Sequence, residues 1–200
     1  MYNKNNWWCF DEALDKETCN KIKDLKNDEW EKGRVYSSIG FIGDKRDDDR
    51  RITDVSWTSD QWLYDLIWPY METANYNSGW RYDIKSAEGM QITRYKKKGF
   101  YGFHRDGGGD HFSTHDAPEN NFKHGRVRKL SMSILLNDSY EGGRFEISSY
   151  DKEKCTISVP EFNKAGSIII FPSYTEHRVS PVTKGVRYSL VVWFLGSPFK

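Results

Sequence analysis

From residue 88 onward, the sequence is divided into short segments rich in β-branched and aromatic residues, and turn-forming residues separate them. Such segments predict strands. In one of them, KLSMSILL, apolar Leu130 and Met132 alternate with Ser131 and Ser133, and this period of two is typical of a strand with two different faces. The predicted strands are GMQITRY, KLSMSILLND, GRFEISS, CTISVP, GSIIIFP, HRVSPV and VRYSLVVWFL.

The first third of the chain predicts two helices. In DKETCNKIKDLKNDEW, Asp15 is a candidate N-cap, and apolar Cys19 and Ile22 follow at helical spacing. In SDQWLYDLIWPYMETANY, apolar residues form one helical face, and Pro69 predicts a kink or a break. Two helices followed by about seven or eight strands indicate a mainly β, α+β fold, such as a sandwich or jelly-roll barrel with the helices packed on one face.

Charge and length narrow the function classes. The chain has 200 residues, and we expect a single domain over residues 1–200. Lys and Arg number 30 against 29 Asp and Glu, so no overall field attracts nucleic acid or an anionic membrane. We therefore expect neither of these as a partner.

The cysteines and the N-terminal segment indicate the cellular compartment in which we expect the protein. Cys9, Cys19 and Cys155 are odd in number and scattered, which argues against a disulfide framework and favours a reducing compartment. The first residues lack a signal-peptide pattern, and no apolar run reaches membrane-spanning length. We expect a soluble cytoplasmic or otherwise intracellular protein.

A highly charged stretch, GFIGDKRDDDRRITDVSW, lies between the two predicted helices. Its composition favours a solvated loop. The alternative is a mobile flap that closes over a site, with Gly43 to Trp57 as the closing element.

The segment FHRDGGGD, residues 103–110, contains a His-Arg-Asp triplet of the kind found in the catalytic loop of protein kinases. That loop continues with Leu and has Asn five residues after the Asp. Here Gly107 follows Asp106, and His111 is at the Asn position. A kinase is therefore excluded.

The same triplet contains a His-x-Asp pair, which can bind a metal. His104 and Asp106 point to the same side of an extended chain, and His177 is a candidate third ligand. Two His and one carboxylate form the facial triad of non-haem Fe(II) oxygenases. A rival pair, His115 and Asp116, lies in a polar, Gly-rich segment and lacks this geometry.

The last predicted strand carries a cation. Strand alternation places Arg187, Ser189, Val191 and Trp193 on one face of VRYSLVVWFL. A cation inside an apolar barrel is costly unless it meets an anion, and a ligand carboxylate would supply one. The alternatives are a salt bridge to an internal acid or a side chain that points outward.

Taken in order, the His-x-Asp pair, the EGG at residues 141–143, His177 and Arg187 resemble the 2-oxoglutarate- and Fe(II)-dependent dioxygenases, and within them the prolyl 4-hydroxylases. RKLSMSILLNDSYEGGRFEI and AGSIIIFPSYTEHRVSPVTKGVRYSLVVWF resemble long segments of that family. DRRITDVSW resembles its Arg-x-Ser-x-x-x-Trp flap, with Thr53 and an approximate spacing to Trp57. The resemblance extends over about residues 35 to 196.

The resemblance implies a double-stranded β-helix, which is a form of jelly roll. It implies Fe(II), 2-oxoglutarate and O₂ as the reacting groups, with ascorbate in support. The implied ligands of the metal are His104, Asp106 and His177, and the implied 2-oxoglutarate residues are Arg187 and Tyr95.

Four residues are our candidates for substrate contact, namely Trp193, Tyr101, Trp57 and Arg51. Nucleic-acid demethylases of this superfamily have a second Arg six residues after the first, but here that position is Trp193. This difference also argues against a nucleic-acid substrate.

The resemblance implies hydroxylation of a prolyl residue in an extended protein or peptide, with succinate and CO₂ as co-products. One alternative is the same chemistry on another amino-acid side chain, a free amino acid or a small metabolite. A third is a catalytically silent jelly roll that binds a ligand or partner. The complete triad and Arg187 argue against the silent scaffold, because such polar groups are costly in a core.

Overall fold

The structure, a computed structural model, describes residues 6–25, 30–35, 49–107, 114–149, 155–159 and 161–198. These residues form mainly antiparallel sheet, with two helices, α1 (Lys16–Asp24) and α2 (Gln61–Asn77). The larger sheet contains, in spatial order, β1 (Trp8–Phe10), β12 (Ile168–Pro172), β8 (Val127–Leu135), β15 (Arg187–Gly196), β6 (Met90–Tyr95), β4 (Asp54–Thr58) and β2 (Glu31–Lys32), and β5 (Ile84–Ala87) also pairs with β15.

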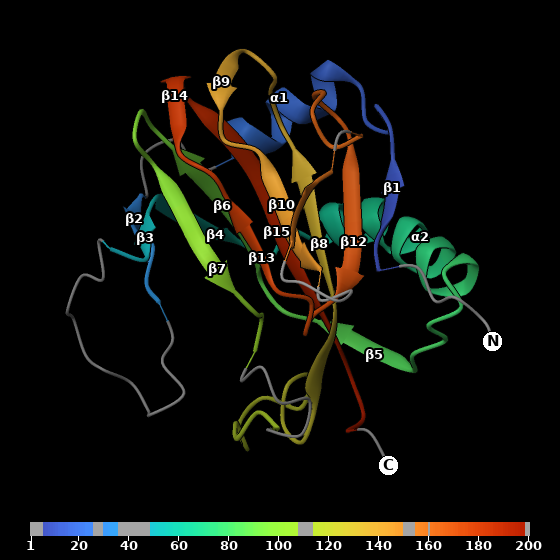
Figure 1. The fold of residues 1–200 in the computed structure, drawn as a ribbon. Coiled ribbons are helices and arrows are strands. Elements are labelled where there is room, and N and C mark those ends of the chain that lie inside the picture. The colour runs from blue at the N-terminus through green and yellow to red at the C-terminus, as the bar shows by residue number, and fades with distance from the viewer. Residues whose placement is uncertain are drawn as a thin grey trace.

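A smaller sheet lies in front of the larger one in Figure 1. Its order is β11 (Cys155–Ser158), β10 (Phe145–Ser149), β13 (His177–Val179), β7 (Phe100–His104) and β3 (Arg51–Ile52). A two-stranded sheet pairs β14 (Val182–Gly185) with β9 (Tyr140–Gly142). The predicted strands all appear, with HRVSPV divided between β13 and β14.

Two hydrophobic clusters fill the molecule. One joins buried residues of both helices, such as Ile22 and Leu63, to one face of the larger sheet. The other contains residues of both sheets, including Phe171 of β12 and Phe145 of β10, and so lies between the sheets. The larger sheet is therefore covered on both faces, and its strands carry two different sets of side chains.

β15 shows this division as the alternation predicts. Leu190, Val192 and Phe194 belong to the cluster that contains the helices. Arg187 and Ser189 are equally buried but belong to neither cluster, and the Arg187 guanidinium lies 6.0 Å from the ring centre of Phe162 in the inter-sheet cluster. The inner face of β15 thus carries polar groups into the space between the sheets.

The two helices begin and continue for identifiable reasons. The Asp15 carboxylate accepts a hydrogen bond from the Thr18 backbone N–H at 2.7 Å, which confirms the predicted N-cap and lowers the pKa of Asp15. α2 continues through Pro69, so the break that Pro69 predicts is wrong. Leu63, Ile67 and other α2 residues are fully buried, and this packing offsets the hydrogen bond that proline removes.

The charged stretch between the helices corrects the prediction of a solvated loop. Part of it forms β3 and β4, and the Asp54 carboxylate in β4 pairs with Arg94 at 2.9 Å and with Lys96 at 3.1 Å. Because neighbouring strands neutralise these charges, a charged segment can join a sheet. Residues 36–48, which include the first part of the predicted Gly43–Trp57 flap, lie outside the described residues.

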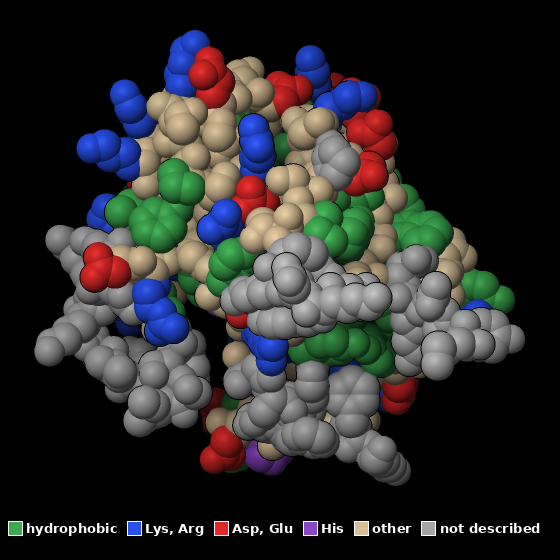
Figure 2. Space-filling view, in the orientation of Figure 1, with side chains coloured by type: hydrophobic (Ala, Val, Ile, Leu, Met, Phe, Trp, Pro, Cys, Tyr) green, Lys and Arg blue, Asp and Glu red, His purple; other side chains and the backbone are tan. Residues whose placement is uncertain are grey.

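Charges of both signs are mixed on the surface. On the face in Figure 2, Lys and Arg side chains lie among Asp and Glu side chains, and hydrophobic side chains appear between them. Among the helices that the structure describes, none is both long and apolar enough to cross a membrane.

Candidate active site

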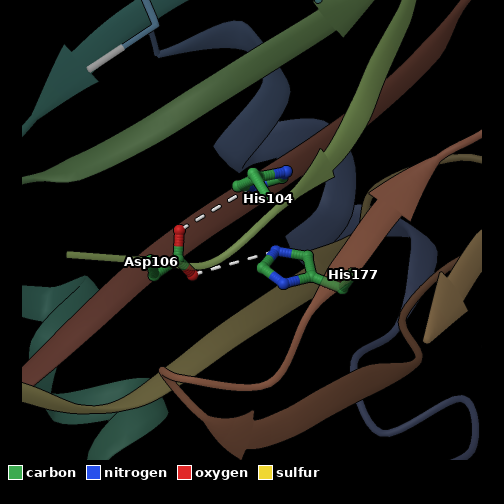
Figure 3. Close-up of side chains that lie close together, drawn as sticks. All are labelled: His104, Asp106 and His177. Carbon is green, nitrogen blue, oxygen red and sulfur yellow. Dashed lines mark ion pairs between the residues drawn. The ribbon is translucent and has the colours of Figure 1, made fainter. Parts of the chain in front are cut away.

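Three polar side chains converge at the end of the smaller sheet. His104 ends β7, Asp106 follows two residues later, and His177 begins β13, where it pairs directly with His104. Figure 3 shows the Asp106 carboxylate turned toward both imidazoles. One ligand atom from each residue lies within 4.8 Å of the others, which is close enough to hold a metal ion. The predicted triad is therefore assembled, from strands far apart in sequence.

A backbone carbonyl orients each of the two imidazoles. The Nδ1 atom of His104 lies 2.8 Å from the Gly102 carbonyl oxygen, and that of His177 lies 2.8 Å from the Thr175 carbonyl oxygen. Since a carbonyl only accepts, each Nδ1 donates its proton to the backbone, and Nε2 is the nitrogen that remains to face Asp106. Both Nε2 atoms lie 3.9 Å from an oxygen of Asp106. Burial, together with the neighbouring His177, lowers the pKa of His104 to about 3, so this ligand is neutral.

The Asp106 carboxylate is held from the larger sheet. Ser131, in β8, donates a hydrogen bond from its hydroxyl to Oδ2 of Asp106 at 2.6 Å. The Asp106 backbone N–H donates to the Ser173 carbonyl at 2.9 Å. Burial alone would raise the pKa of Asp106, but His177, His104, Arg128 and the Ser131 hydroxyl together lower it. Asp106 is therefore ionised and can serve as an anionic ligand.

Arg187 is a buried cation without an anionic partner. Its side chain is among the largest that are fully buried, at 1% exposure. Its Nη1 donates to the Ser189 hydroxyl at 2.9 Å, whereas its Nε has no hydrogen-bond partner. No carboxylate in the described part of the chain pairs with it. Because an unpaired buried cation is costly, this guanidinium needs an external anion.

Tyr95 is the neighbour of Arg187 across the sheet. The two residues are directly paired in β6 and β15, and the guanidinium lies 5.5 Å from the tyrosine ring centre. Tyr95 is buried at 3% exposure. The structure thus brings the two residues predicted for 2-oxoglutarate together on the inner face of the larger sheet.

The four predicted substrate contacts form two adjoining pairs. Tyr101 stacks on His104, with ring centres 3.5 Å apart, and the Arg51 guanidinium lies 4.4 Å from the Tyr101 ring centre. Trp57 and Trp193 have ring centres 6.2 Å apart, and Trp57 is 45% exposed. One of these rings thus stacks on a member of the metal cluster and another is partly exposed, although the roles of these residues stay predictions.

Sequence reasoning missed an ion pair beside Trp193, between a buried Glu88 and a partly buried Arg128. Glu88, at 3% exposure, accepts hydrogen bonds from Arg128 at 2.5 Å and 3.0 Å, and the Arg128 guanidinium lies 4.1 Å from the Trp193 ring centre. Burial would raise the pKa of Glu88, but His115, Arg128 and Lys123 outweigh it and lower the pKa. A Glu before one strand and an Arg in another were the only signals in the sequence, and they do not reveal the pairing.

The rival metal pair is not part of a metal cluster. His115 Nε2 lies 3.4 Å from a carboxylate oxygen of Glu88. Among the residues that the structure describes, one group of three or more potential ligands comes together, and it contains neither His115 nor Asp116. His111 falls outside the described residues.

Sequence comparison places this site in a known family. The sequence profile of the 2OG-Fe(II) oxygenase superfamily matches residues 90–195, more than half of the chain, and the chain belongs to this superfamily. A PKHD-type hydroxylase of Xylella fastidiosa (strain M12) is 37% identical over 106 residues, which are 52% of this chain and 42% of that protein. One of Hyphomonas neptunium is 38% identical over 91 residues, 44% of this chain and 38% of that protein. The chain thus spans about two fifths of the length of these curated relatives.

Solved structures share the fold. A Pseudomonas putida prolyl-4-hydroxylase matches with a TM-score of 0.66 at 18% identity, over 94% of this chain and 91% of that one. The viral collagen prolyl hydroxylase of Paramecium Bursaria Chlorella virus-1, in a 2OG complex, gives 0.64 at 18% identity, over 98% and 99%. A Trichoplax adhaerens prolyl hydroxylase in complex with a hypoxia inducible factor peptide fragment gives 0.61 at 13% identity, over 96% and 84%.

Proposed function

We propose that this chain is an Fe(II)- and 2-oxoglutarate-dependent dioxygenase that hydroxylates a prolyl residue in an extended protein or peptide segment. The observation that carries the proposal is the buried, unpaired Arg187 guanidinium within the same inter-sheet space as a neutral His, a second His and an ionised Asp. The Arg187 guanidinium needs an anionic ligand, and the two His and the Asp can bind a metal. This combination agrees with the family to which the chain belongs.

The three side chains of the metal cluster fit Fe(II). His104, Asp106 and His177 offer two imidazole nitrogens and one carboxylate, which is the donor set of non-haem Fe(II) oxygenases with open coordination positions. Iron held there, with 2-oxoglutarate and O₂, supplies the oxidant that hydroxylates an unactivated C–H bond and leaves succinate and CO₂. The protein's part is to hold and orient the reactants and to exclude water.

Arg187 and Tyr95 are the proposed 2-oxoglutarate residues. The far carboxylate of 2-oxoglutarate supplies the anion that Arg187 lacks, through a charge-assisted hydrogen bond to the free Nε. The Tyr95 hydroxyl adds a further donor from the adjacent strand. Because both groups stand on rigid, paired strands, the bound acid has one orientation relative to the metal cluster.

Gly143 in the EGG sequence supports this pocket, and replacing it gives a test. Its φ is +58°, and an added Cβ would lie 3.0 Å from Cδ of Arg187. The added Cβ would also lie 3.0 Å from Cγ2 of Val182. Gly143→Ala is therefore expected to displace Arg187 and to weaken 2-oxoglutarate binding about tenfold, a change of about 1.4 kcal/mol. Isothermal titration of 2-oxoglutarate into the anaerobic Mn(II) protein measures this change.

Gly79→Ala is the matched control for Gly143→Ala. Gly79 has a similar φ of +71°, but an added Cβ there meets nothing within 4 Å. Both variants introduce backbone strain of about 1–2 kcal/mol, so both lower the stability. Equal 2-oxoglutarate affinity in the two variants would show that the contact with Arg187 has no role.

Several finer features belong to the same proposal. The two sheets form a double-stranded β-helix, with α1 and α2 packed on the larger sheet, and residues 1–200 form one dioxygenase domain; the shared hydrophobic clusters support both statements. Ascorbate supports activity by keeping the metal reduced.

The aromatic pair of Trp57 and Trp193 suits a proline-rich segment, because polyproline chains are preformed and dock on aromatic surfaces.

The test follows 2-oxoglutarate turnover. The protein is purified without oxygen, supplied with Fe(II) and 2-oxoglutarate, and exposed to O₂ with and without a panel of proline-containing peptides. We expect succinate to rise with at least one peptide, and that peptide to gain the mass of one oxygen on its proline. Succinate formation that no peptide increases would retain the oxygenase and reject the prolyl substrate in favour of another side chain, a free amino acid or a small metabolite. Absence of succinate under all conditions would favour the silent scaffold.

A further inference from the structure

The Asp106 carboxylate differs from the two imidazoles in how it is oriented. Each histidine is held by a backbone carbonyl two residues before it, Gly102 for His104 and Thr175 for His177. The Asp106 side chain is instead held by the hydroxyl of Ser131, at 2.6 Å. Among the described residues, this is the one side-chain hydrogen bond to a member of the metal cluster. A substitution at Ser131 can therefore alter the outer support of the cluster without altering a ligand.

Ser131 is itself rigidly held. It is fully buried in β8, where it pairs with Phe171 in β12 and with Trp193 in β15. Its hydroxyl also lies 3.0 Å from the Ser173 hydroxyl, while the Ser173 carbonyl receives the Asp106 backbone N–H at 2.9 Å. The two serines thus hold both the backbone and the carboxylate of Asp106 against the larger sheet. Because Ser131 is fully buried, removal of its hydroxyl leaves the Asp106 carboxylate without this partner.

A second group, Arg128, also acts on the Asp106 carboxylate. The partly buried Arg128 guanidinium helps to lower the pKa of the Asp106 carboxyl, and it is held in place by Glu88. The Ser131 bond fixes Oδ2 on the side where it lies 3.9 Å from Nε2 of His177.

We propose that Ser131 is a positioning residue that orients the Asp106 carboxylate toward the two imidazoles and thereby raises the metal affinity of the cluster. This inference rests on the proposed metal site. Residues that hydrogen-bond to metal ligands typically contribute about 10- to 100-fold to metal affinity. The serine thus acts on metal retention through Asp106 and touches neither metal nor substrate.

The test measures metal binding rather than turnover. The metal-free protein is titrated with Co(II) under anaerobic conditions, and the visible d–d absorption reports both the affinity and the ligand geometry. Ser131→Ala is expected to weaken Co(II) binding about 10- to 100-fold and to change the shape of the absorption band. Ser131→Thr, which keeps a hydroxyl on the same carbon, is expected to bind Co(II) more tightly than Ser131→Ala.

Ser133→Ala is the matched control. Ser133 lies two residues along β8, pairs with Ile169 of the inter-sheet cluster, and is similarly buried, but it has no hydrogen bond to Asp106. The Ser133→Ala variant is expected to bind Co(II) with the same affinity as the unmodified chain. Equal affinities for Ser131→Ala and the unmodified chain would overturn the inference, as would equal losses in the two alanine variants.

A further variant separates this inference from the proposed function. His104→Ala removes a ligand and is expected to abolish the Co(II) spectrum. If the unmodified chain gave no such spectrum, or if His104→Ala left it unchanged, the metal site itself would be wrong and the inference would fail with it. If His104→Ala abolished the spectrum and Ser131→Ala left the affinity unchanged, the role of Ser131 alone would be rejected.

Discussion

Replacing Asp106 with alanine is expected to abolish 2-oxoglutarate turnover, with a loss of at least about 10³-fold, because two imidazoles alone do not retain the metal that the reaction requires. The fold is expected to persist. Asp106 follows β7 rather than pairing within a strand, and Ser131 keeps the Ser173 hydroxyl as a neighbour when the carboxylate is removed. The loss of the Asp106 hydrogen bond is expected to lower stability by about 1–3 kcal/mol. Succinate production and urea unfolding measure the two effects.

His104→Ala is expected to give the same result, and His124→Ala supplies the control. His124 is also a histidine, but its side chain is 51% exposed and it lies outside the metal cluster. The His124 variant is expected to retain full turnover. Full activity in either ligand variant would show that the metal lies elsewhere. A loss that matched global unfolding would show that the residue is structural.

Arg187→Met is expected to have opposite effects on 2-oxoglutarate binding and on the stability of the ligand-free protein. Removing the cation from a buried, hydrogen-bonded charge pair costs about 2–5 kcal/mol of binding, which corresponds to a loss of about 30- to 5,000-fold in affinity for 2-oxoglutarate. The Michaelis constant for the peptide substrate is expected to stay nearly constant. Without 2-oxoglutarate, Met removes an uncompensated buried charge and is expected to stabilise the fold by about 1–4 kcal/mol.

The control for this prediction is Arg178→Met. Arg178 lies in β13, is partly exposed and pairs with Glu146 at 2.5 Å, so its removal breaks an ion pair without affecting the Arg187 pocket. It is expected to leave 2-oxoglutarate affinity unchanged and not to stabilise the protein. An equal loss of 2-oxoglutarate and peptide affinity in Arg187→Met would argue for a structural arginine. A less stable ligand-free Arg187→Met would argue that the guanidinium already has an anionic partner.

Local patterns made part of the site predictable. The spacing of His104 and Asp106 is a local property, and the alternation in VRYSLVVWFL is enough to place Arg187 and Trp193 on one face. His177 could be proposed as a candidate third ligand from its residue type, and the resemblance to a family then supported that choice. The structure confirms that the three potential ligands meet, whereas the roles of Arg187, Tyr95 and the substrate contacts stay predictions.

Other features could not be predicted, because they depend on contacts between distant segments. The Ser131–Asp106 bond joins residues 25 positions apart, and the Glu88–Arg128 pair joins residues 40 positions apart. β4 was not predicted because an Asp such as Asp54 is typical of a loop. The sequence does not show that Arg94 lies beside Asp54 and neutralises its charge. In each case the partner of the side chain lies on or next to another strand. The pairing register of the strands determines which residues become neighbours.

The supports of the metal cluster come from both sheets. The two imidazoles project from β7 and β13 of the smaller sheet, whereas the carboxylate is tied to β8 and to the residue after β12 in the larger sheet. A cation shared by these side chains would therefore act as a cross-link between the two layers. Loss of the metal would remove this one cross-link, so that metal binding is expected to stabilise the packing of the two sheets against each other.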